Sequence, residues 1–170
     1  MVTTHTLSDP TFMTADQVLQ ALHDVHDPEI PALSIVDLGM IGELIIQGEN
    51  ITVKLIPTFI ACPALDWIRH QVKERLKQMG FRKVEVVHDD QTVWTSDRIS
   101  EEGRRKLQAF GLTPPARNCG RWTEASLAAV TCPHCGSSNT VLRSFFGSTL
   151  CRSTHYCNQC RQVFESFKPV

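Results

Sequence analysis

The chain has 170 residues, 42% of them hydrophobic, and a formal net charge of −1. This length suits one ordinary domain, or a small domain with an appendage, and the apolar content is enough for a core. The charge lacks the basic excess of a typical nucleic-acid-binding protein. No apolar run approaches the roughly 20 residues that a membrane helix needs, so a membrane protein is not expected.

Seven cysteines are the most informative part of the composition. The start of the chain has no charged segment followed by an apolar core, so we expect no signal peptide and a cytoplasmic location. In that setting, cysteines predict reduced thiols and metal sites rather than disulfides. The odd number also leaves at least one cysteine unpaired.

The first part of the chain begins with a helix and a hairpin. Thr14 and Gln17 form a capping box that predicts the helix, and the Asp-Pro pair at 27–28 should end it, because the residue before proline leaves the helical region. Residues 41–47 and 51–56 are apolar and extended, and the turn residues between them predict a hairpin.

Two more helices and further strands follow. Apolar residues at steps of three and four predict a long amphipathic helix over residues 64–79. Residues 84–88 predict a strand, and Val93 and Trp94 are expected to continue the sheet. Ser100 caps a last helix. The predicted order is α-β-β-α-β-β-α, an α/β fold with helices packed on a small mixed sheet.

A change of composition marks a second, smaller unit. Residues 14–112 form the predicted α/β domain, and residues 113–130 form a predicted linker, with two prolines and a short helix around 124–129. Residues 131–170 are rich in cysteine, serine, threonine and aromatic residues. A unit of roughly forty residues rarely folds on its apolar core alone and usually needs a staple.

Two C-x-x-C knuckles supply that staple. Their cysteines are Cys132 with Cys135 and Cys157 with Cys160, and 21 residues separate the two knuckles. Two tight turns at that separation let four thiolates meet tetrahedrally on one structural Zn²⁺. Four unrelated buried cysteines are the alternative, which the paired spacing disfavours. The sequence therefore predicts a C-terminal zinc ribbon.

The ribbon is expected to present a surface to a partner rather than to bind nucleic acid. Residues 131–170 hold four basic residues and one acidic residue. A Zn(Cys)₄ site carries a charge of about −2, which largely offsets this balance. The aromatic side chains could stack on bases, but in so small a unit they more readily form the core.

Cys62 lies in the segment TFIACP, between a predicted strand and a predicted helix. The N-terminus of a helix favours a thiolate, and Pro63 suits the first helical position. A buried packing thiol is the plain alternative. A thiol hydrolase would need a histidine partner; His70 lies two turns along the helix, and nothing selects another.

Three acids, Asp27, Glu29 and Asp37, lie in one loop. Turn formation and helix capping account for such residues in many proteins. They could also be hard oxygen ligands that help a thiolate to hold iron. The sequence leaves open whether Cys119 or Cys151 joins Cys62 in space.

These residues form a recognisable pattern: Asp27-Pro-Glu29, Val36-Asp-Leu-Gly39, and Thr58-x-x-x-Cys62-Pro63 before a long helix. Residues 14–115 resemble the metal–sulfur cluster assembly family, which includes SufT-like proteins. With both knuckles, the Phe-Gly-Ser-Thr-x-Cys segment at 146–151 and the chain end, the whole sequence resembles the PaaD family. Some members end in Phe-Lys-Cys, whereas Pro169 follows Lys168 here, so a fifth ribbon cysteine is not an essential ligand.

The resemblance implies an accessory role in the phenylacetyl-CoA epoxidase (ring-1,2-epoxidase) system of aerobic phenylacetate catabolism. That system has a di-iron oxygenase and a reductase with flavin and a 2Fe–2S cluster. The implied role is to mature or repair these centres, with Cys62 as the key cysteine and Asp27 and Glu29 beside it. Iron or an iron–sulfur cluster would bind transiently, and the oxygenase or reductase subunits would be the partners.

Two alternative functions remain open, and so does the oligomeric state. The chain could be a structural subunit of the oxygenase complex, or a zinc-ribbon regulator that binds nucleic acid. It could also form a homodimer in which two Cys62 thiols share one cluster, because a 2Fe–2S cluster needs about four ligands. We expect no catalytic activity of its own, since the sequence has no triad, G-x-G-x-x-G or Walker-type segment.

Overall fold

The computed structural model describes residues 13–59, 62–117, 127 and 130–169. In this part of the chain the predicted α/β class with small sheets and helices is confirmed. The predicted helix around 124–129 and Cys119 lie outside the described residues. The elements are α1 (Ala15–Leu22), β1 (Ile41–Gln47), β2 (Asn50–Leu55), α2 (Leu65–Gln78), β3 (Lys83–His88), the 3₁₀ helix η2 (Ser96–Arg98), α3 (Glu101–Ala109), β4 (Leu112–Thr113), β5 (Thr140–Ser144), β6 (Arg152–Cys157) and β7 (Val163–Phe167).

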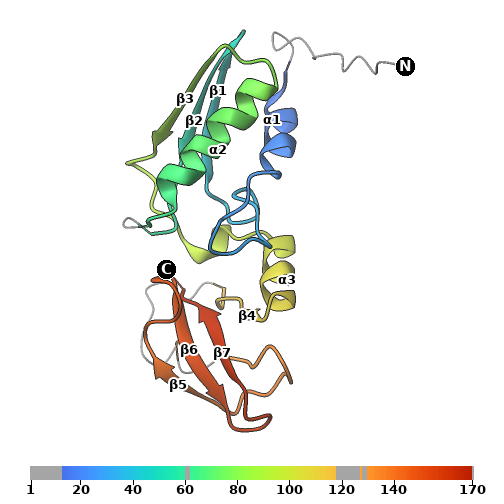
Figure 1. Ribbon diagram of the computed structural model, residues 1–170, viewed down its shortest axis with the longest axis vertical. Helices are drawn as coiled ribbons and strands as arrows, with labels where there is room; N and C mark the ends of the chain where they lie inside the picture. Colours follow the sequence, from blue (N-terminus) through green and yellow to red (C-terminus); the bar gives the residue numbers. More distant parts are fainter. Residues whose placement is uncertain (1–12, 60–61, 118–126, 128–129, 170) are drawn as a thin grey trace, which may run out of the picture.

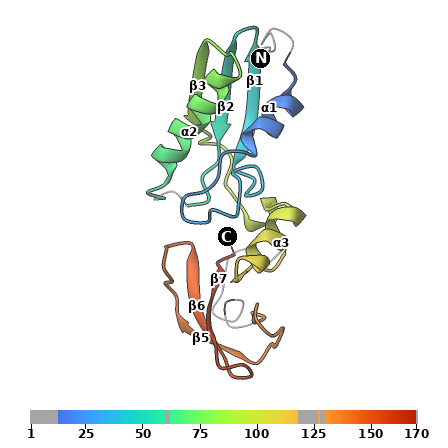
Figure 2. The ribbon, with the colours of Figure 1, turned by 45° about the vertical axis from the view of Figure 1, so that its right-hand side comes forward.

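The molecule is elongated, with a sheet toward each end (Figure 1). One sheet has the order β1-β2-β3, with β1 antiparallel and β3 parallel to β2. The other has the order β4-β7-β6-β5. Both views place α1 and α2 beside the first sheet and α3 between the two sheets (Figures 1 and 2). None of the described helices is long and apolar enough to cross a membrane.

The predicted elements of the first sheet are present. The capping box forms, with the backbone N–H of Thr14 donating to Gln17 Oε1 at 2.9 Å. α1 ends at Leu22, before the Asp-Pro pair, because a turn of i→i−3 bonds tightens its end. The core of this part comes from alternate residues of β2 and one face of α2: Ile51, Val53, Leu55, Ile68, Val72 and Leu76.

The strand predicted at Val93 and Trp94 is wrong, since neither residue is in a strand. Trp94 is instead an anchor: its ring is 2% exposed, and its indole N–H donates to the carbonyl of Leu38 at 2.8 Å. A buried indole needs such a partner. The Trp94 ring also lies 5.9 Å from the Phe167 ring of β7, so it joins the two parts of the chain.

The ribbon packs against the α/β part and is not merely tethered to it by a flexible linker. β4 follows α3 directly and pairs with β7 in parallel, with Thr113 opposite Ser166. The boundary predicted at residues 112–113 thus falls within this short strand. Phe167 and Cys151 of the ribbon belong to the same apolar cluster as the core of the α/β part.

Asp37 belongs to this framework rather than to a ligand site. Its carboxylate is 2% exposed and accepts hydrogen bonds from Lys106 Nζ at 2.6 Å and from Ser34 Oγ at 2.8 Å. Its carbonyl accepts the backbone N–H of Ser100 at 2.9 Å. These bonds attach the loop before β1 to α3.

Candidate functional site

The sulfur atoms of the two knuckles converge on one point in the ribbon. The sulfurs of Cys132 and Cys160 are 3.7 Å apart, those of Cys135 and Cys157 are 3.6 Å apart, and all four lie within 4.8 Å of one another. A tetrahedron with Zn–S bonds of about 2.3 Å has edges of about 3.8 Å. Two of the sulfur–sulfur distances match this edge, and the four thiols together supply the ligand set of one Zn²⁺ ion.

The two knuckles have the same backbone geometry. In each, the residue after the second cysteine donates its N–H to the carbonyl of the first cysteine at 2.9 Å: Gly136 to Cys132, and Arg161 to Cys157. These two residues have φ values of 73° and 61°. The backbone N–H of Cys160, 3.5 Å from the Cys157 sulfur, and that of Gln159 help to lower the pKa of Cys157 to about 7, whereas burial raises the pKa of Cys160 to about 12. Donors aimed at sulfur favour the thiolate that a metal needs.

Cys62 lies in the loop between β2 and α2 and is half-buried. Its carbonyl accepts the N–H of Leu65, the first residue of α2, at 3.2 Å. The N-cap of the helix is Ala64, so Pro63 precedes the helix instead of starting it, contrary to expectation.

The expectation that the helix start would lower the pKa of Cys62 is also wrong. Burial raises the pKa of the Cys62 thiol, and the backbone of Ala64 offsets this only in part. The charges of Asp27, Glu29 and Cys151 raise it further. Cys62 is thus a neutral thiol at neutral pH.

The acidic loop combines turn formation with a position at the site. Asp27 is 6% exposed, and its Oδ1 accepts the backbone N–H groups of Glu29 at 2.7 Å and Ile30 at 3.1 Å. Burial raises the pKa of the Asp27 carboxyl despite these two bonds. A bound cation would relieve the cost of a charge held there.

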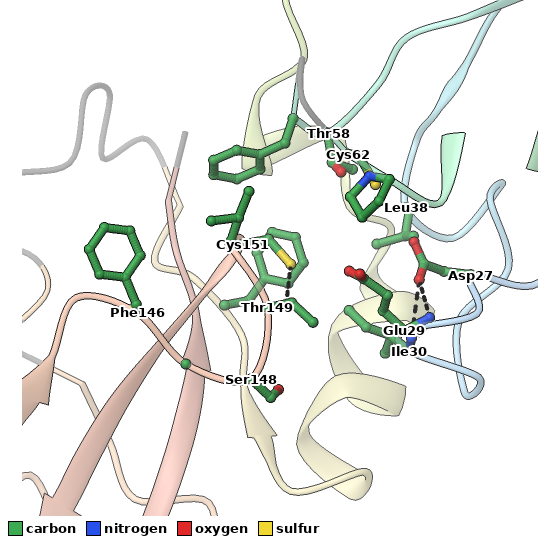
Figure 3. Close-up of a pocket in the computed structure, with 15 residues that line it drawn as sticks. Asp27, Glu29, Ile30, Leu38, Thr58, Cys62, Phe146, Ser148, Thr149 and Cys151 are labelled. Carbon is green, nitrogen blue, oxygen red and sulfur yellow. Dashed lines mark hydrogen bonds between the residues drawn. The ribbon is translucent and has the colours of Figure 1, made fainter. Parts of the chain in front are cut away.

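A cavity of about 290 Å³ brings these residues together, between the α/β part and the ribbon. Asp27, Glu29 and Cys62 line it from the α/β part (Figure 3). The ribbon contributes residues 146–151, including Cys151, whose sulfur lies 3.0 Å from the hydroxyl of Thr149. No histidine is among the described residues that line the cavity, so the hydrolase interpretation gains no partner.

The cavity does not have the geometry of a finished single-ion site. Among the described residues, only the four knuckle cysteines form a group of three or more donors within 4.8 Å of one another. The thiol and carboxyl groups that line the cavity face the same space, but they do not converge on one position that an ion could occupy. They suit a labile or larger cargo rather than a permanently held ion.

Sequence reasoning did not assign Cys151 to this site. The residue lies 89 positions after Cys62, and no local spacing connects them. The only signal is its place at the end of the segment 146–151, which forms part of the resemblance.

Two family models match the chain. Residues 15–88 match a family described as iron–sulfur cluster assembly protein, and residues 117–168 match the PaaD zinc beta ribbon domain. The fold and the cysteine cluster thus define a class: an iron–sulfur cluster assembly domain joined to a zinc ribbon.

A protein of Escherichia coli (strain K12) is 37% identical over 155 residues, which span 91% of this chain and 92% of that protein. Its name assigns it provisionally as one of the subunits of 1,2-phenylacetyl-CoA epoxidase. At this identity and coverage, the chain belongs to the PaaD family, as the resemblance predicted.

Other relatives match the first part of the chain. The Fe-S protein maturation auxiliary factor of Porphyromonas gingivalis (strain ATCC BAA-308 / W83) is 28% identical over 103 residues, which are 59% of this chain and 97% of that protein. A solved structure of a conserved hypothetical protein from Thermotoga maritima has a TM-score of 0.50 and 32% identity, and covers 57% of this chain and 96% of its own.

Proposed function

We propose that this protein is an accessory factor of the phenylacetyl-CoA epoxidase system that matures an iron–sulfur or di-iron centre. The observation that carries the proposal is the cavity, in which Cys62 faces Asp27 and Glu29. The name of the Escherichia coli relative supports a link to the phenylacetyl-CoA epoxidase system. The name of the Porphyromonas gingivalis relative supports a role in the maturation of iron–sulfur proteins.

The chemistry of the cavity suits transient binding of iron or an iron–sulfur cluster as cargo. A neutral thiol and a buried carboxyl with raised pKa values give up protons when a cation binds. A thiolate with carboxylate neighbours combines soft and hard ligands for iron. Few protein ligands leave coordination positions open, so a client can take over the cargo.

The ribbon has a separate task in this proposal. Cys132, Cys135, Cys157 and Cys160 hold a structural Zn²⁺ that keeps the small sheet folded. Phe146 and Leu150 of the ribbon are 65% and 49% exposed and lie at the cavity. We infer that this edge contacts the oxygenase or reductase subunit that receives the cargo.

The same exposed edge also supports a second candidate, a structural subunit of the oxygenase complex. Apolar side chains at a surface are typical of a protein contact. Co-purification with the assembled enzyme in fixed stoichiometry would favour a structural subunit. Weak or transient association would favour a carrier.

Replacing Cys62 tests the carrier directly. We expect Cys62→Ser to abolish epoxidase activity in cells while the fold and one equivalent of zinc are retained, because serine removes the sulfur ligand without adding bulk. His70→Ala, an exposed change on α2, is the matched control and should leave activity unchanged. Full activity of the Cys62→Ser strain would contradict the proposal.

A further inference from the structure

Cys151 is one of the three cysteines outside the zinc cluster, and it is buried in an unusual place. It is 9% exposed and packs in the apolar cluster of the α/β part, although it belongs to the ribbon. Its carbonyl accepts the backbone N–H of Lys168 at 2.9 Å, which fixes it to the end of β7. The position of its sulfur is therefore set by the docked ribbon.

We propose that Cys151 is the second thiol ligand for the cargo, so that the two parts of the chain build one composite site with Cys62. This inference rests on the proposed function and goes beyond it by naming a second ligand. It also gives the ribbon a chemical role besides that of a docking surface.

The arrangement of side chains around the cavity supports this assignment. Figure 3 shows the sulfur of Cys151 and the carboxylate of Glu29 directed toward the same space, with Cys62 above them. Cys151 packs in the apolar cluster, and its sulfur contacts the hydroxyl of Thr149. It also lines a cavity that it shares with another thiol and two carboxyl groups.

The electrostatics of the cavity favour a cation. Burial raises the pKa of the Cys151 thiol and outweighs the hydrogen bond with Thr149 and the charge of Arg152, which lower it. The charges of Glu29 and Asp27 add a smaller rise to this pKa. No lysine or arginine is among the described residues that line the cavity, although Arg152 and Lys168 lie close enough to interact with Cys151. A metal cation offsets the repulsion between the thiolates and the two acids when the thiols lose their protons.

Arg152 fixes the two parts of the site relative to each other. Its guanidinium donates to the backbone carbonyl of Glu29 and pairs with Glu165 at 3.0 Å. The residue next to Cys151 is thereby bonded to the acidic loop that lines the cavity. This contact adds to the Trp94–Phe167 packing and the β4–β7 pairing, which also hold the two thiols in relation to each other.

The test loads the zinc-replete full-length chain with ferrous iron alone, under anaerobic conditions and without sulfide. Every sulfur bound to iron then comes from a cysteine, and X-ray absorption at the iron edge counts these sulfurs. Zinc should stay in the ribbon, since thiolate sites prefer it to ferrous iron. We expect two sulfurs per iron in the wild type, and one in Cys151→Ser with at least about tenfold weaker iron binding.

Controls separate this inference from the proposed function. Leu150→Ala, at the same cavity but without a donor atom, should bind iron like the wild type. A wild type with one sulfur per iron, or Cys151→Ser with unchanged binding, overturns the inference and leaves the Cys62 carrier standing. A wild type that binds no ferrous iron overturns the inference, and one that also binds no iron when sulfide is supplied overturns the carrier as well. The number of sulfur ligands per iron in the wild type is measured without any variant. It therefore tests the inference even if Cys151→Ser folds poorly.

Discussion

Among single residues, Arg161 occupies a conformation that its side chain disfavours. It takes the position in the second knuckle that Gly136 takes in the first, with φ values of 61° and 73°. The left-handed region costs a residue with a Cβ atom about 1–2 kcal/mol relative to glycine. The ribbon tolerates this cost because the N–H of Arg161 closes the knuckle on the Cys157 carbonyl.

This symmetry predicts opposite effects for two substitutions. Arg161→Gly should stabilise the zinc-loaded ribbon by up to about 1 kcal/mol. Gly136→Ala should destabilise it by about 1 kcal/mol through backbone strain alone, because a Cβ atom there meets nothing within 4 Å. Urea unfolding of the zinc-loaded proteins measures both. A neutral Gly136→Ala together with a destabilising Arg161→Gly would show that the conformations carry no strain.

Between elements, the contact of Asp37 with Lys106 holds α3 to the loop before β1. Burial alone would raise the pKa of the Asp37 carboxyl, but the hydrogen bonds from Lys106 and Ser34 outweigh it and keep the pKa below its usual value. A carboxyl with a depressed pKa stabilises the fold above its unfolded pKa, and this contribution is lost as the pH falls through the folded value.

Asp37→Asn should therefore lower the free energy of unfolding by about 1–3 kcal/mol at neutral pH. The difference from the wild type should shrink below about pH 4, where the unfolded aspartate takes up its proton. Chemical unfolding at neutral and acidic pH measures the effect. Glu74→Gln, which disrupts an exposed pair with Lys77 on α2, is the matched control and should cost little. An Asp37→Asn effect that is independent of pH would argue for a purely steric role.

For the molecule as a whole, the shared apolar cluster makes the ribbon part of the stability of the α/β domain. Phe167 is 1% exposed and packs on Trp94 across the junction. The parallel pairing of β4 with β7 adds backbone bonds at the same place. The two parts should therefore unfold together rather than independently.

Removal of residues 131–170 tests this coupling. Zinc content should fall by about one equivalent, because all four knuckle cysteines are removed. The remaining part should lose about 3 kcal/mol or more of stability, since the loss of Phe167 and Cys151 opens its core. Metal analysis and urea unfolding give the two results. Unchanged zinc would refute the ribbon site, and unchanged stability would refute the shared core.

The sequence by itself determined what depends on local patterns. Apolar periodicity predicted α2 and the β1–β2 hairpin, the capping box predicted the start of α1, and paired spacing brought out the four knuckle cysteines. In each case the residues that cooperate lie within a few positions of one another, or repeat a turn of fixed geometry. The local backbone conformation therefore decides how these residues lie relative to one another within each helix, hairpin or knuckle.

Only the tertiary structure decided which distant residues meet. It turned Trp94 from a strand residue into an anchor, placed Cys151 at the cavity of Cys62, and raised the pKa of Cys62 where a helix start alone would lower it. Each outcome depends on burial at the junction between the two parts. Burial is set by packing between segments far apart in the chain, and local sequence does not encode it.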